Sequence, residues 1–217
     1  MSPQAAALIV FLMEMLSALI SIFVGYKASK AYKASSAKGL LFLYLGFMIL
    51  GLGIFLRTVT ATYFVLVIRV TDAVPSSLVG LSNVAGIVFT ITQLIAYSLF
   101  VATYAYQSKG LDQQSIGVGG VLAAVFPVAR LFYIPALEIV ALAMLGFVAL
   151  SSLINWLHRK TLNSALVFLG FGLMFFSHAL FLFIVFNEGF LFFGQISQLV
   201  GFIFLLLMLA KVNKANA

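Results

Sequence analysis

The chain has no cysteine, one tryptophan and four prolines in 217 residues. Without cysteine, disulfide bonds, thiolate nucleophiles and cysteine-ligated metal sites are all excluded. Charged side chains are scarce as well: they make up 8% of the residues, and only five are acidic. Because soluble domains carry about a quarter of their residues charged, this composition excludes an ordinary water-soluble fold.

Long apolar runs take the place of the missing charge. Hydrophobic residues make up 64% of the chain, and their runs are about 20 residues long, enough to cross a bilayer as helices. We therefore predict an all-α integral membrane protein with seven transmembrane helices. The predicted spans cover residues 5–27, 39–60, 80–106, 115–131, 134–157, 163–186 and 190–211. The first run lacks the positive start of a secretory signal, so we expect it to be retained.

Two stretches fit this pattern less well. The span predicted at 115–131 is the shortest and contains three glycines and Pro127. The segment 61–79 is rich in β-branched residues. A helix extension, an interfacial segment and a small hairpin are all compatible with its sequence, and the choice among them stays open.

The basic residues predict the orientation. If the N-terminus lies outside and the C-terminus in the cytoplasm, the inner segments hold nine basic residues and the outer segments three, the bias typical of cytoplasmic loops. The inner set is Lys27, Lys30, Lys33, Lys38, Lys109, Arg159, Lys160, Lys211 and Lys214, and the outer set is Arg57, Arg69 and Arg130. The net charge of +7 is then an orientation signal with some affinity for anionic lipid, and it does not indicate nucleic acid. We expect a multi-pass protein of the cell membrane.

The sequence also shows signs of an internal repeat. The Leu-Gly-Phe triplets at 45–47 and 169–171 lie 124 positions apart, and the same offset relates Glu14 to Glu138. A second offset, 105, relates Gln93 to Gln198. We predict one transmembrane domain over 1–217, with a parallel 3+1+3 layout as in some transporters. Repeat one covers about 5–110, a linker helix about 115–131, and repeat two about 134–214.

Glu14 and Glu138 are acidic residues inside apolar runs. An ionised carboxylate at the bilayer centre costs about 3 kcal/mol on insertion scales, so each needs a partner or a proton. With a rise of about 1.5 Å per residue, His178 lies near the depth of Glu138, and Arg57 lies within reach of Glu14. We predict the pairs Glu138–His178 and Glu14–Arg57.

Polar residues form helical stripes on three spans. In the third span the stripe is Asn83, Gly86, Thr90, Gln93 and Tyr97, and in the seventh it is Glu188, Leu191, Gln195, Gln198 and Phe202. In the first span it is Glu14, Ser17, Ala18, Ser21 and Gly25. Such faces cannot point at lipid, so we expect them to face other helices or a wet cavity. Ordinary polar packing between membrane helices explains them equally well.

We expect a binding site between the repeats, in the outer half of the membrane. Its predicted residues are Glu14, Glu138, Gln93, Gln198, His178 and Arg57. The leading hypothesis is a carrier or receptor-like binder of protons or of a small polar or cationic solute. The alternative is a non-catalytic subunit of a larger membrane complex, with partner subunits or copies of itself. No motif indicates an enzyme, a cofactor or a metal, and membrane lipid is the one partner expected in either case.

Overall fold

In the computed structural model, the described part of the chain forms six helices, each long and apolar enough to cross a membrane. They are α1 (Pro3–Ser35), α2 (Lys38–Thr71), α3 (Ser76–Ser108), α5 (Pro135–Arg159), α6 (Leu162–Leu182) and α7 (Gly189–Ala215). The structure describes residues 3–71, 76–108, 135–184, 186–187 and 189–215. The predicted all-helical fold is confirmed, and six apolar helices of this length support a multi-pass membrane protein. The count of seven stays a prediction, because the span at 115–131 lies outside the described residues.

The side chains of several charged residues are not described. Nothing is described for the side chains of Arg69, Lys109, Arg130, Glu188 and Lys214. The predicted partition of charge therefore concerns the remaining basic residues.

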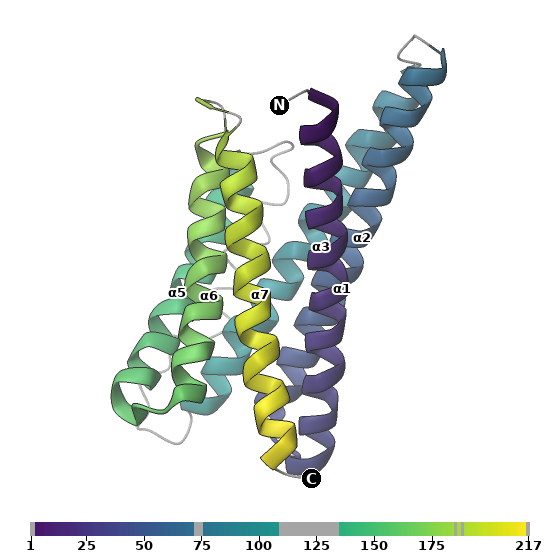
Figure 1. Ribbon diagram of the computed structural model, residues 1–217. Helices are drawn as coiled ribbons and strands as arrows, with labels where there is room; N and C mark the ends of the chain where they lie inside the picture. Colours follow the sequence, from purple (N-terminus) through teal and green to yellow (C-terminus); the bar gives the residue numbers. More distant parts are fainter. Residues whose placement is uncertain (1–2, 72–75, 109–134, 185, 188, 216–217) are drawn as a thin grey trace.

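The helices form a closed ring (Figure 1). Going round it, α1 contacts α2, α2 contacts α3, α3 contacts α5, α5 contacts α6, α6 contacts α7, and α7 returns to α1. Within each half, neighbouring helices are antiparallel, as their short connections require. At the two places where the halves meet, α3 runs parallel to α5 and α7 runs parallel to α1.

The two tight turns of the ring have the same local structure. The residue after α1 is Ser36, whose φ is 55° and whose N–H donates to the Tyr32 carbonyl at 2.7 Å. The residue after α5 is Lys160, whose φ is 48° and whose N–H donates to the Trp156 carbonyl at 2.7 Å. Both are left-handed helix caps, which reverse the chain within a few residues. The two caps lie 124 positions apart.

The segment 61–79 is resolved in favour of helix extension. α2 continues to Thr71 and α3 begins at Ser76, so the described parts of this segment lengthen both helices. α2 has 34 residues against 21 in α6. At about 1.5 Å per residue α2 exceeds the roughly 30 Å of a hydrocarbon core. Figure 1 shows the far ends of α2 and α3 leaning away from the other helices.

Aromatic rings fill the middle of the ring of helices. Phe47, Phe100, Phe171 and Phe202 are at most 1% exposed. The Phe47 ring centroid lies 4.6 Å from that of Phe100 and 6.0 Å from that of Phe202, and Phe100 lies 5.4 Å from Phe171. Large side chains such as Leu150 point outward instead, as expected of a surface covered by lipid.

Glycine permits the closest helix contacts. A Cβ on Gly46 would lie 2.5 Å from Phe100 and 3.1 Å from the Ala96 carbonyl oxygen. A Cβ on Gly170 would lie 2.5 Å from Leu205 and 3.1 Å from the Gly201 carbonyl oxygen. Each glycine thus brings the α2–α3 or the α6–α7 backbones together, as small residues do in membrane bundles.

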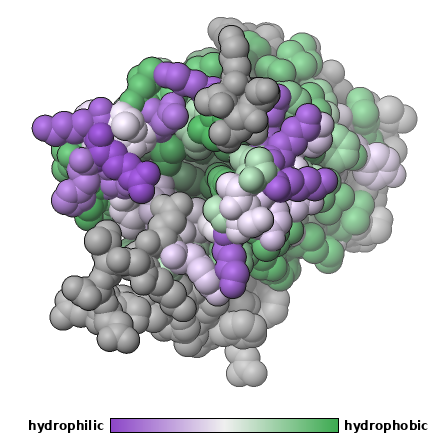
Figure 2. All heavy atoms as spheres, turned by 90° about the horizontal axis from the view of Figure 1, so that it is seen from below, coloured by the Kyte–Doolittle hydropathy of each residue, from purple (hydrophilic) through white to green (hydrophobic). Residues whose placement is uncertain are grey.

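Basic side chains gather at one end of the bundle, which we call the basic end. It holds the α1–α2 turn, the α5–α6 turn and the C-terminal end of α7, and Figure 2 shows hydrophilic side chains spread over it. The described basic residues there are Lys27, Lys30, Lys33, Lys38, Arg159, Lys160 and Lys211. Arg57, by contrast, lies toward the opposite end, which we call the far end.

Candidate functional site

The first polar cluster surrounds Glu14 and joins three helices. Arg57 of α2 donates from Nη2 to Glu14 Oε1 at 2.7 Å. Gln195 of α7 donates from Nε2 to the same oxygen at 3.1 Å. Thr58 Oγ1 lies 2.9 Å from Glu14 Oε2. The Glu14 side chain is 13% exposed, so its charge is enclosed by partners from within the chain.

Arg57 is held in place on a second side. Its guanidinium lies over the Phe89 ring of α3, 4.1 Å from the centroid. A cation over an aromatic face is attracted by the ring quadrupole. Arg57 therefore links α1, α2 and α3, and its fixed position makes it a resident counter-ion for Glu14.

The second cluster surrounds His178 and joins the other three helices. His178 Nδ1 lies 2.7 Å from Glu138 Oε2 on α5, and Nε2 lies 2.5 Å from the Tyr97 hydroxyl on α3. The Gln93 amide nitrogen of α3 lies 3.5 Å from each ring nitrogen, at the outer limit of hydrogen bonding. Tyr97 is fully buried, and the side chain of His178 is 3% exposed.

The imidazole is fixed in orientation by the rings around it. The Tyr97 and Phe181 rings meet it edge to face, with interplanar angles of 86° and centroid distances of 5.3 and 5.5 Å. Glu138 differs from His178 in exposure, because its side chain is 32% exposed. It is therefore the exposed end of this series of contacts. The result is a continuous path of polar atoms from Glu138 through His178 to Tyr97.

Proton positions along this path follow from the chemistry of its groups. A carboxylate only accepts hydrogen bonds, so Nδ1 donates to an ionised Glu138. Nε2 then accepts from the Tyr97 hydroxyl in neutral imidazole, or donates to its oxygen in imidazolium. Both arrangements use the same heavy-atom contacts.

Both predicted pairs, Glu14–Arg57 and Glu138–His178, are present in the structure. The structure places five of the six predicted residues in two clusters, and among the described residues no hydrogen bond joins the clusters. Gln93 belongs to the second cluster. Gln198 is 7% exposed in α7, and the described residues give its amide no hydrogen-bond partner.

The stripe on α3 is only partly buried, which corrects one expectation. Gln93 and Tyr97 face the interior, but Asn83 and Gly86 are exposed. A Cβ on Gly86 would meet nothing within 4 Å. The first turns of α3 belong to the far end, which leans away from the other helices in Figure 1.

Two residues of the first cluster were missed as site residues. The stripe on the seventh span includes Gln195. The repeat, however, relates Gln198 to Gln93, so Gln198 was predicted as the site residue of that span. Thr58 directly follows Arg57. To predict its contact with Glu14, one must know how α2 is rotated about its own axis. The periodicity of the sequence does not give that rotation.

Two buried hydroxyls near the clusters have no hydrogen-bond partner among the described residues. They are Ser17, one turn from Glu14 on α1, and Ser177, beside His178 on α6. Among the described residues, no three His, Asp or Glu side chains come together as a group that could hold a metal ion. Ionisable groups inside membrane helices are typical of proton relays and ion pathways.

Both clusters therefore lie inside a helix ring, toward its far end, with the aromatic core between them and the basic end. Comparison with models of protein families, with curated proteins and with solved structures finds no match.

Proposed function

We propose that the protein is a membrane carrier that binds protons, or a small cation or amine, at Glu138. The observation that carries this proposal is the Glu138–His178–Tyr97 path, with contacts of 2.7 and 2.5 Å across three helices. It works by reversible binding and catalyses no reaction. Ionisable groups placed inside membrane helices commonly mark proton and ion pathways.

The exposure of the two carboxylates supports Glu138 as the exchanging group. Its side chain is 32% exposed and has a single partner in the described residues, while the Glu14 side chain is 13% exposed and has three. A solute cation approaching Glu14 would have to displace Arg57. At Glu138 it would compete only with a histidine, which can give up its charge by losing a proton.

The proposed carrier is built as a parallel 3+1+3 repeat. The glycine contacts support it, because Gly46 and Gly170 lie 124 positions apart and Phe100 and Leu205 lie 105 apart. The two left-handed caps share the offset of 124. Parallel α3 and α5 are what an intervening crossing at 115–131 would require. In transporters with repeats, binding sites lie near the interface of the repeats, and their relative rocking gives alternating access.

The proposed orientation places the basic end in the cytoplasm and the N-terminus outside, in the cell membrane. Seven of the eight basic residues whose side chains are described lie at that end, and Arg57 is the eighth. Cytoplasmic ends carry such an excess of Lys and Arg. The proton site then opens toward the outer half of the bilayer.

A second candidate function is that of a non-catalytic subunit in a larger membrane complex. The hydrogen bonding of Glu14 favours it, because a carboxylate with three donors from its own chain needs no solute. In that case both clusters hold the ring of helices together, and the outer faces meet partner subunits.

The test is ion uptake by the full chain reconstituted in liposomes. A pH-sensitive dye inside reports proton entry, and labelled methylammonium reports amine entry. We expect flux above protein-free liposomes for the wild type and at least a tenfold loss in Glu138→Gln. Glu14→Gln is the matched control, and we expect it to keep its flux.

Wild-type liposomes with no flux, together with purification of the chain in fixed ratio with partner subunits, would favour the second candidate. Equal flux in the wild type and Glu138→Gln would remove Glu138 from the proposed site.

A further inference from the structure

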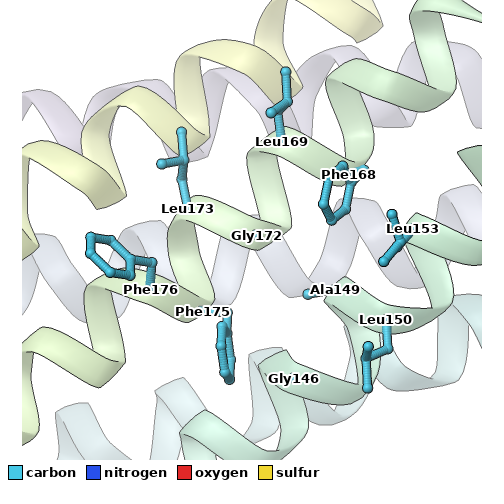
Figure 3. A pocket seen from close by; sticks show the side chains of 10 residues that line it. All are labelled: Gly146, Ala149, Leu150, Leu153, Phe168, Leu169, Gly172, Leu173, Phe175 and Phe176. Atoms are coloured by element: carbon cyan, nitrogen blue, oxygen red, sulfur yellow. The ribbon is translucent and has the colours of Figure 1, made fainter.

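A groove opens on the outer side of the ring, between α5 and α6. Its volume is about 490 Å³ (Figure 3). It is lined by Gly146, Ala149, Leu150, Leu153, Phe168, Leu169, Gly172, Leu173, Phe175 and Phe176. All of these are apolar or glycine. The groove is separate from both polar clusters, which face the interior.

The groove exists because small residues face each other across the two helices. A Cβ on Gly172 would meet only Phe168, at 3.8 Å. The α1–α2 pair shows the same place filled: 124 positions earlier, Met48 packs against Gly25, whose added Cβ would lie 3.0 Å from Met48 Cγ. One glycine in place of a methionine therefore leaves space on the α5–α6 side.

The groove leads toward the basic end. Trp156 stacks on Phe168 at the end of the groove nearer the basic end. The ring centroids are 5.6 Å apart and the angle between the ring planes is 7°. Beyond them the exposed side chains of His158, Arg159 and Lys160 mark the membrane surface. From Gly146 to Arg159 the helix rises about 20 Å. One leaflet makes up half of a roughly 30 Å hydrocarbon core, so this length is enough to cross one leaflet.

This end attracts anions in two ways. Arg159 and Lys160 supply positive charge, and α6 starts here with its amide groups and the positive end of its dipole. The two acidic residues whose side chains are described, Glu14 and Glu138, lie toward the far end. Tryptophan at this depth is typical of a membrane interface.

We propose that the α5–α6 groove binds a membrane lipid with an anionic headgroup. One alkyl chain lies along Gly146, Ala149 and Gly172, and the phosphate of the headgroup lies against Arg159 and Lys160. A phosphate pairs well with a guanidinium, which can present two parallel N–H donors. A narrow apolar groove ending in basic side chains matches a chain that ends in an anion, whereas a partner helix would place no charge there.

The experiment measures lipid retained by the purified full chain. The protein is exchanged into mixed micelles of phosphatidylglycerol and phosphatidylcholine, and bound lipid is counted by native mass spectrometry. We expect about one phosphatidylglycerol per chain, preferred at least tenfold over phosphatidylcholine. Gly172→Met, which copies the filled α1–α2 side, reduces retention at least tenfold.

Gly86→Met is the matched control, since it adds the same side chain to an exposed glycine of α3. It keeps wild-type retention. Arg159→Gln with Lys160→Gln keeps a bound lipid but abolishes the preference for phosphatidylglycerol. Equal retention by the wild type and Gly172→Met overturns the proposal. The proposal is also overturned if Gly172→Cys cross-links two copies of the chain and no lipid is retained.

Discussion

Glu14 and Glu138 hold matching places in the chain, but their surroundings differ. Glu14 is enclosed by donors from α2 and α7, and its counter-ion Arg57 is permanently charged. Glu138 has a histidine as counter-ion and remains one-third exposed. Two carboxylates at matching places thus differ both in exposure and in the nature of their cation. Glu14 ties α1, α2 and α7 together, and in the proposed function Glu138 is the group that binds and releases.

The largest expected effect comes from removing the resident cation of the first cluster. Arg57→Met leaves the charge of Glu14 inside the membrane without its counter-ion. We expect a loss of about 3 kcal/mol in the free energy of unfolding, the lower end for a broken buried pair. Unfolding of the protein by SDS in mixed micelles measures it.

The double variant Glu14→Gln with Arg57→Met is the control, and it should recover part of the loss because no unpaired charge remains. His178→Met should cost less than Arg57→Met, since the Glu138 side chain is 32% exposed and the Glu14 side chain 13%. A larger loss in His178→Met would reverse the comparison between the clusters.

The next effect tests whether the two halves are packed alike. Gly46→Ala and Gly170→Ala each force a Cβ to within 2.5 Å of a side chain in the neighbouring helix. Overpacking of this kind costs about 1 to 3 kcal/mol, so we expect two similar losses of about 1.5 kcal/mol. Gly86→Ala, with open space around it, should change stability by less than about 0.5 kcal/mol. A large loss at one glycine only would contradict equivalent packing.

The helical architecture and the two ion pairs could be predicted from sequence because both depend on distance along a helix. A rise of about 1.5 Å per residue places His178 near Glu138 and Arg57 near Glu14. The partner from α7 could not be chosen in this way. Gln195 and Gln198 lie on one face, and only the vertical offset between α1 and α7 brings Gln195 to Glu14.

Burial along α3 was the part that periodicity could not supply. The stripe from Asn83 to Tyr97 indicates which face of the helix is polar, but it does not show how far the neighbouring helices extend. The first turns of α3 lean away from the other helices, so Asn83 and Gly86 remain exposed while Gln93 is covered. The divergence of the helices toward the far end is set by tertiary packing and is invisible to a helical pattern.

A smaller effect probes the inner end of the exchangeable cluster. Tyr97→Phe removes the hydroxyl that lies beside His178 Nε2 and leaves that nitrogen buried without its partner. We expect a loss of about 1 kcal/mol in stability, typical of one hydrogen bond. The ¹⁵N signal of His178 Nε2 should shift. The signal of Nδ1, which contacts Glu138, should stay unchanged. Tyr44→Phe, a partly buried tyrosine outside both clusters, is the control and should leave both signals unchanged.

The smallest effect concerns Thr58, whose hydroxyl has one proton and two acceptors. Oγ1 lies 2.9 Å from Glu14 Oε2 and 2.8 Å from the Ile54 carbonyl, so it can donate to only one of them at a time. Thr58→Val keeps the volume, and Glu14 keeps Arg57 and Gln195. We therefore expect a loss of about 0.6 kcal/mol, the average for hydrogen bonds between membrane helices, in the same SDS titration. Proton uptake into liposomes should stay unchanged, because the exchangeable carboxylate is on the other side of the ring. A drop in uptake as large as that of Glu138→Gln would show that the two clusters act as one site and that Glu14 takes part in exchange.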